Sequence, residues 1–108
     1  MKEIRAYIQP FMLPKVTETL LEIPGFPGMS VSECEGFGRE RDADNQNYTP
    51  YLNNKRIEIF SPDELVDRIF SAIMSAANTH QHGAGKVYVL NVDRSGHIST
   101  GEEEKDSI

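Results

Sequence analysis

The order in which two hydrophobic periodicities alternate along the chain is the feature that most constrains its fold. Apolar residues at every second position, typical of a strand with one buried face, occur in four segments, at 4–9, 29–34, 56–60 and 87–92. Apolar residues spaced three or four apart, typical of a helix with one buried stripe, occur in two segments, at 13–23 and 65–77. The predicted order of elements is therefore β-α-β-β-α-β.

Proline, glycine and capping residues mark the boundaries of these elements. Pro10 ends the first strand, and Pro14 suits the first turn of the helix that follows. The segment 24–28, Pro-Gly-Phe-Pro-Gly, stops that helix. The segment 61–64, Ser-Pro-Asp-Glu, has the spacing of a capping box with proline at the first helical position, so we expect the second helix to begin there.

The element order predicts an α+β fold. Right-handed crossovers that bury both helix stripes give the ferredoxin-like split β-α-β-β-α-β arrangement, a four-stranded antiparallel sheet with two helices on one face. Tyr7, Tyr88 and Leu90 have the parity to lie on the other face of the sheet. A small domain with an apolar second face is a candidate for a closed oligomer.

Length and charge exclude several classes of protein. A chain of 108 residues suits one domain with a single core, here residues 1–108. A formal net charge of −6 gives nucleic-acid binding little support. No run approaches the roughly 18 apolar residues of a membrane span, and the N-terminus lacks a signal peptide's apolar core, so we expect a cytoplasmic protein without membrane insertion. The single cysteine, Cys34, cannot form an intramolecular disulfide, which agrees with a reducing compartment.

Residues 79–86, Thr-His-Gln-His-Gly-Ala-Gly-Lys, form a loop between the second helical pattern and the last strand pattern. Gly83 and Gly85 let the backbone approach a ligand closely and turn N–H groups inward, and Lys86 adds a positive charge. The loop is a candidate phosphate cradle, although its spacing differs from that of a P-loop. The alternative is a plain glycine-rich connection.

Residues 39–54 are polar and show neither periodicity. A long segment of this kind inside a small domain is usually a binding loop or a disordered insertion, so we expect a loop that stays mobile until a partner binds. Tyr48, Tyr51 and Leu52 offer apolar anchors for a partner protein.

Five blocks of sequence, in order along nearly the whole chain, resemble the P-II nitrogen regulatory signalling proteins. They are 1–11 (Met-Lys-Glu-Ile-Arg-Ala-Tyr-Ile-Gln-Pro-Phe), 28–39 (ending Gly-Phe-Gly-Arg), 56–59 (Arg-Ile-Glu-Ile), 83–86 (Gly-Ala-Gly-Lys) and 100–102 (Thr-Gly-Glu). The resemblance implies a homotrimeric regulator, not an enzyme. It would bind ATP, ADP or AMP, with Mg²⁺ as a candidate companion ion, between subunits and control a target enzyme or membrane transporter through its long loop. The nucleotide-binding residues it implies are Gly36, Gly38, Arg39, Glu40, Gly83, Ala84, Gly85 and Lys86.

The chain departs from the family pattern at several positions. Ala84 stands where the family usually has an aspartate, and Glu40 stands where it has the glutamine that helps to bind 2-oxoglutarate through Mg²⁺. The C-terminal segment, 94–108, has His97-Ile98-Ser99 in place of the family's Arg-x-Arg. Neither Tyr48 nor Tyr51 matches the tyrosine that some members modify. These differences indicate a divergent member with a target and effector range of its own.

A metal-binding trimer is the alternative function. His80 and His82 stand two apart, and His97 lies in a tail that we expect to fold against their loop, so three imidazoles with Glu40 or Cys34 would suit a transition metal. A small hydrolase is less well supported, because no positioned nucleophile or general base is visible in the sequence.

Overall fold

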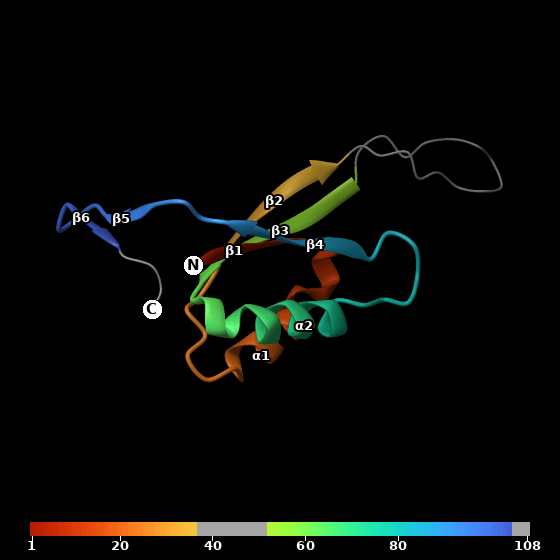
Figure 1. Cartoon of the computed structure of the whole chain (residues 1–108). Helices are drawn as coiled ribbons and strands as arrows, with labels where there is room; N and C mark the ends of the chain where they lie inside the picture. The colour runs from red at the N-terminus through yellow and green to blue at the C-terminus, as the bar shows by residue number, and fades with distance from the viewer. Residues whose placement is uncertain (37–51, 105–108) are drawn as a thin grey trace.

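The computed structural model of the protein describes residues 1–36 and 52–104, and Figure 1 shows the order of its elements. The elements are β1 (Lys2–Ile8), the 3-10 turn η1 (Pro10–Met12), α1 (Leu13–Leu21), β2 (Ser30–Gly36), β3 (Leu52–Ser61), the 3-10 turn η2 (Asp63–Leu65), α2 (Val66–Ala76), β4 (Gly85–Asn91), β5 (Ser95–His97) and β6 (Glu102–Glu104).

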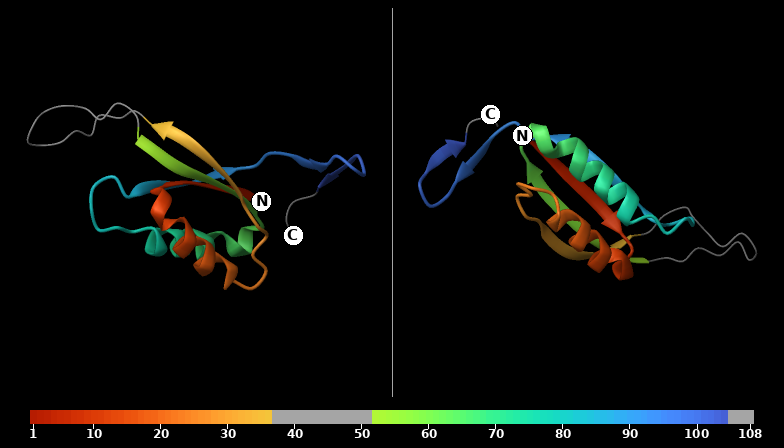
Figure 2. Two further views of the ribbon diagram at one scale, coloured as in Figure 1. Left: turned by 180° about the vertical axis from the view of Figure 1, so that it is seen from behind. Right: turned by 90° about the horizontal axis from the view of Figure 1, so that it is seen from below.

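Strands β1 to β4 form one antiparallel sheet in the order β2-β3-β1-β4. Both helices cover the same face of this sheet, as the views from behind and from below show (Figure 2). The predicted ferredoxin-like α+β fold is therefore confirmed. Neither helix is long and apolar enough to cross a membrane, and the same holds for every helix in the part of the chain described.

The core lies between the sheet and the two helices. Its fully buried members from β1 and β3 follow the predicted alternation, and those from α1 and α2 follow the predicted stripes. They include Ile4, Ala6, Ile57 and Ile59 from the sheet and Val16, Leu20, Ile69 and Ile73 from the helices. Met74, one of the apolar residues of the predicted helical segment 65–77, lies outside this core, and 53% of its surface is exposed. It follows Ile73 by one position, which turns it about 100° away from the buried stripe.

The capping-box prediction for 61–64 is wrong in its hydrogen bonds, although a helical segment does begin there. Ser61 is the last residue of β3, and its Oγ donates to the Pro62 carbonyl oxygen at 2.8 Å. Pro62 is the cap residue of η2, and no side chain caps that turn. The strand pairing of Ser61 with Lys2 holds Ser61 away from the helix terminus, so tertiary structure overrides the local motif.

The starts of β3 and β4 and the structure of the tail also differ from the prediction. Strand β3 begins at Leu52, so residues 52–54 belong to the sheet and not to the loop assigned to 39–54. Strand β4 begins at Gly85, which puts the last two residues of the predicted glycine loop in the sheet. The polar tail contains the hairpin β5–β6, whose two strands pair with each other. Figure 1 shows this hairpin apart from the helices and from the four-stranded sheet.

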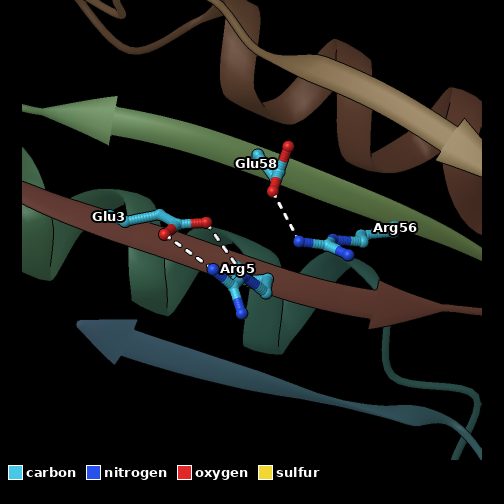
Figure 3. A network of polar contacts seen from close by, with 4 residues as sticks. All are labelled: Glu3, Arg5, Arg56 and Glu58. Atoms are coloured by element: carbon cyan, nitrogen blue, oxygen red, sulfur yellow. Dashed lines mark hydrogen bonds and ion pairs between the residues drawn. The ribbon is translucent and has the colours of Figure 1, made fainter.

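The sheet face opposite the helices, which we call the open face, carries Tyr7, Tyr88 and Leu90, as their parity predicts. Charged residues lie beside them on β1 and β3 (Figure 3). Arg5 donates two hydrogen bonds of 2.9 Å to Glu3. Arg56 donates one of 2.7 Å to Glu58. Since Phe60 and Tyr88 are about half exposed, the open face combines aromatic surface with the two ion pairs of β1 and β3.

Candidate functional site

The glycine loop enters β4 through Gly85, which pairs with Ile8 of β1. Gly85 has φ +122°, and a Cβ placed on it would lie 1.9 Å from the Tyr7 carbonyl oxygen. No side chain fits at that contact, so glycine is required both for the backbone conformation and for the approach of the two strands. The close pairing fixes the end of the loop against β1.

Two hydrogen bonds hold the rest of the loop. The Asn78 side-chain oxygen accepts a 2.7 Å bond from the N–H of His80, whose φ of 61° is in the left-handed region. The Gln9 side-chain amide donates a 2.8 Å bond to the carbonyl of Gly83. Ala84 lies over a hollow of about 200 Å³ between α2 and β4. The loop is therefore fastened to the fold at both glycines and at its start.

Lys86 stands on the open face, because it pairs with Tyr7 across β1 and β4. The register continues this row through Arg56 of β3 to Ser32 of β2. The Arg56 guanidinium carbon lies 6.0 Å from the centre of the Tyr7 ring, and the Tyr7 and Tyr88 rings meet edge to face at 6.2 Å. Lys86 is exposed, and no carboxylate of the described residues pairs with it. Its charge is therefore available to an anion.

The paired charges of the open face contrast with Lys86. The hydrogen bonds to Glu3 raise the pKa of the Arg5 guanidinium above its ordinary value. Arg56 pairs with Glu58, and its Nε is buried without a hydrogen-bond partner in the part of the chain that the structure describes. Among the cations of residues 1–36 and 52–104, Lys86 is thus the one best placed to bind a phosphate near the glycine loop.

Gly36, the predicted binding residue on the other side of the site, ends β2 and pairs with Leu52. Strands β2 and β4 are the two edges of the sheet, with β3 and β1 between them. Standard strand spacings place Gly36 and Gly85 about 17 Å apart, at the same end of the sheet. Within one chain these two segments do not contact the same phosphate group.

The other predicted site residues near Gly36 lie outside the described residues. They are Gly38, Arg39 and Glu40 for the nucleotide, and Tyr48 and Tyr51 for a partner protein. Leu52, the third predicted anchor, is the first residue of β3. Its position puts the root of the predicted docking loop, between β2 and β3, at the same end of the sheet as the glycine loop.

The metal hypothesis finds no assembled ligand set among residues 1–36 and 52–104, which contain no group of three or more His, Cys, Asp or Glu suited to a metal. His80 and His82 are exposed. His97 lies in β5, beyond the C-terminal end of β4, whereas the histidine loop precedes the first residue of that strand. The tail therefore does not fold against the loop of its own chain, contrary to expectation, because β4 separates them (Figure 1).

The hairpin β5–β6 is held by side-chain contacts of its own. Arg94 donates two 3.0 Å hydrogen bonds to Glu103, which raise the pKa of its guanidinium. His97 Nε2 lies 3.7 Å from a Glu104 carboxylate oxygen. Ile98, beside the turn, is fully exposed. In the sequence, this hairpin is marked by Gly101, a glycine at its turn. In the structure Gly101 has φ +75°, which favours glycine.

Comparison with known proteins gives a consistent result. The sequence model of the family described as "Nitrogen regulatory protein P-II" matches residues 1–102. A protein of that name from Haemophilus influenzae is 40% identical over the full length of both chains. "Nitrogen regulatory protein P-II 1" of Escherichia coli is 39% identical, and the protein from Rhodobacter capsulatus is 37% identical, again over both full lengths.

Proposed function

The chain belongs to the P-II family of nitrogen regulatory proteins, and from that premise we propose that it is a homotrimer that binds an adenine nucleotide between neighbouring subunits. Proteins of this family are signal-transduction regulators and not enzymes. The nucleotide, ATP, ADP or AMP with Mg²⁺ as a candidate companion, would switch the control of a target enzyme or membrane transporter in the cytoplasm. Nitrogen regulation is the process in which we place it.

The main observation in support of this proposal is that the predicted site residues are divided between the two edges of the sheet. Gly36 ends the β2 edge, and Gly83 to Lys86 lie at the β4 edge. The two segments are about 17 Å apart in one chain, too far to close on one phosphate group. A second copy that brings its β2 edge beside the β4 edge of the first would complete the site.

The open face supports association of copies. Phe60 and Tyr88 expose aromatic surface next to the half-buried Tyr7 and beside the ion pairs Arg5–Glu3 and Arg56–Glu58. Burial of this face in a trimer would remove apolar area from water and would leave Arg5 and Arg56 paired with their carboxylates, while the charge of Lys86 would be met by the phosphate of the nucleotide. The face is therefore better suited to a stable contact between copies than it would be if Arg5 and Arg56 had no partners.

The segment 39–54 is the proposed docking element. It leaves the sheet at Gly36 and returns at Leu52, so a nucleotide bound near Gly36 acts at its root. A nucleotide shifts the conformational equilibrium of this segment only by the difference in its affinity for the conformations. Tyr48, Tyr51 and Leu52 are the proposed anchors for the target.

Titration calorimetry of the purified protein with ATP, ADP and AMP, with and without Mg²⁺, tests the nucleotide site. Replacement of Lys86 by alanine removes a charge-assisted contact worth about 1.5–3 kcal/mol, which corresponds to a roughly ten- to hundredfold loss of affinity. The matched control is Lys15→Ala, which removes the same charge from the exposed surface of α1.

Three outcomes would contradict the proposal. The nucleotide site is wrong if the wild-type protein binds none of the three nucleotides at millimolar concentration. The role of Lys86 is wrong if the Lys86 and Lys15 variants bind equally well. Light scattering that gives a stable monomer at micromolar concentration would exclude the trimer.

A further inference from the structure

We propose that Gln9 is a positioning residue of the nucleotide site, which sets the direction of the peptide group between Gly83 and Ala84. This inference rests on the proposed nucleotide binding by the glycine loop. Gln9 follows the last residue of β1 and is separated from the loop by most of the chain. Its side-chain amide nevertheless donates a 2.8 Å hydrogen bond to the Gly83 carbonyl.

The geometry of a peptide group turns this contact into control of a donor. The carbonyl and the following N–H of a trans peptide point in opposite directions. No cis peptide bond occurs among the described residues. The bond from Gln9 to the Gly83 carbonyl therefore directs the Ala84 N–H away from Gln9. No turn, loop or side-chain hydrogen bond of the described residues uses that N–H, so it is available to an anion.

The loop is held by other contacts on both sides of the peptide group between Gly83 and Ala84. Gly85 is held by its pairing with Ile8, and the turn at His80 is held by Asn78. Between these points Gly83 has φ +82°, a conformation from which glycine departs easily. Without the bond from Gln9 the peptide can rotate, and the ligand would have to order it on binding. A preorganised donor avoids that cost.

The test compares Gln9→Met with the wild-type protein. Methionine has nearly the length and volume of glutamine and lacks the donor. We expect the affinity for ATP to fall about three- to tenfold, the range for one modest hydrogen bond. The matched control is Asn91→Ala, which removes the 2.7 Å hydrogen bond that Lys2 of β1 donates to Asn91 of β4. This bond lies at the end of β4 opposite the glycine loop, so its loss should leave the affinity for ATP unchanged.

The backbone amide signal of Ala84 in NMR spectra separates positioning from general stability. In the wild-type protein ATP should shift this signal downfield, as expected of an N–H that donates to a phosphate oxygen, and in Gln9→Met the shift should be reduced. Gln9→Lys supplies an ammonium donor of similar reach and should restore the shift. Because the added charge also attracts ATP, the shift and not the affinity decides the rescue.

Each result supports or overturns the inference. If Gln9→Met binds ATP as tightly as the wild-type protein and shows the same Ala84 shift, Gln9 has no positioning role, while nucleotide binding stands. If all variants lose ATP binding equally, Asn91→Ala included, the effect is general destabilisation and the inference fails. If the wild-type protein binds no nucleotide, the proposed function fails and this inference fails with it.

Discussion

Replacement of Gly85 by alanine should destabilise the protein more than the same replacement at any glycine that has open space around it. The new Cβ would lie 1.9 Å from the Tyr7 carbonyl oxygen, and 3.0 Å is the shortest distance that real Cβ contacts show. Strands β1 and β4 must therefore separate by about 1 Å at this pair, and overpacking of this kind costs about 1–3 kcal/mol. The φ of +122° adds strain of about 1–3 kcal/mol.

The expected loss is about 2–6 kcal/mol, a large part of the roughly 5–15 kcal/mol that stabilises a domain of this size. Gly28→Ala is the matched control. Gly28 also has a positive φ, +102°, but a Cβ there meets nothing within 4 Å. Its loss should be confined to the strain, about 1–3 kcal/mol.

Urea unfolding of the three proteins, followed by circular dichroism at one protomer concentration, measures the difference. Equal losses in the two variants would refute the reasoning, because the close contact between the strands would then contribute nothing. A Gly85→Ala variant that also binds ATP normally would show further that the pairing of Gly85 with Ile8 does not shape the loop.

Two further predictions concern the ends of β1 and β3. The N-terminal ammonium pairs with Asp63 at 2.8 Å, and this contact lowers the pKa of the Asp63 carboxyl below its ordinary value of 3.8. The stabilisation from this pair should therefore be fully present above pH 3.8, and it should be lost as the pH falls through the lowered pKa. Stability curves of the wild-type protein and Asp63→Asn should therefore differ at neutral pH and converge in acid, and a constant difference would exclude the pair as the cause. Deletion of residues 42–51 leaves five residues between Gly36 and Leu52, enough for a hairpin connection, so the oligomer should persist while target binding is lost. Retained target binding in a pull-down would place the docking surface elsewhere.

Hydrophobic periodicity was sufficient to predict the fold because it determines which face of each element is buried. The alternation of Ile4, Ala6 and Ile8 and the stripe that includes Ile69 and Ile73 both appear in the core. Boundaries were less predictable. Gly85 and Lys86 belong to a segment that looks like a glycine-rich loop in the sequence, yet both pair with β1 as part of β4. The glycine is needed there for the close approach of the two strands, which leaves no room for a side chain.

The geometry of the candidate site was predictable only where a local sequence pattern marks it. Glycines 83 and 85 were identified from the sequence, and both have the positive φ that makes glycine necessary. Gln9 was not identified, because its contact with Gly83 joins distant parts of the chain and follows no periodicity. The Ser61 capping motif failed for the converse reason, since a local pattern was overridden by the pairing of Ser61 with Lys2.

The division of the proposed site between two sheet edges also links assembly to ligand binding. A nucleotide that contacts the β4 edge of one copy and the β2 edge of the next binds the assembled protein and not the separate chain. By mass action each such site then stabilises the oligomer by RT ln(1 + [L]/Kd), which is about 2.7 kcal/mol per site at a ligand concentration one hundred times Kd. The same coupling requires nucleotide affinity to fall on dilution of the protein, because dissociated chains lack half of the site. A site complete within one chain would bind independently of protein concentration, so this dependence distinguishes the two arrangements without any knowledge of the target.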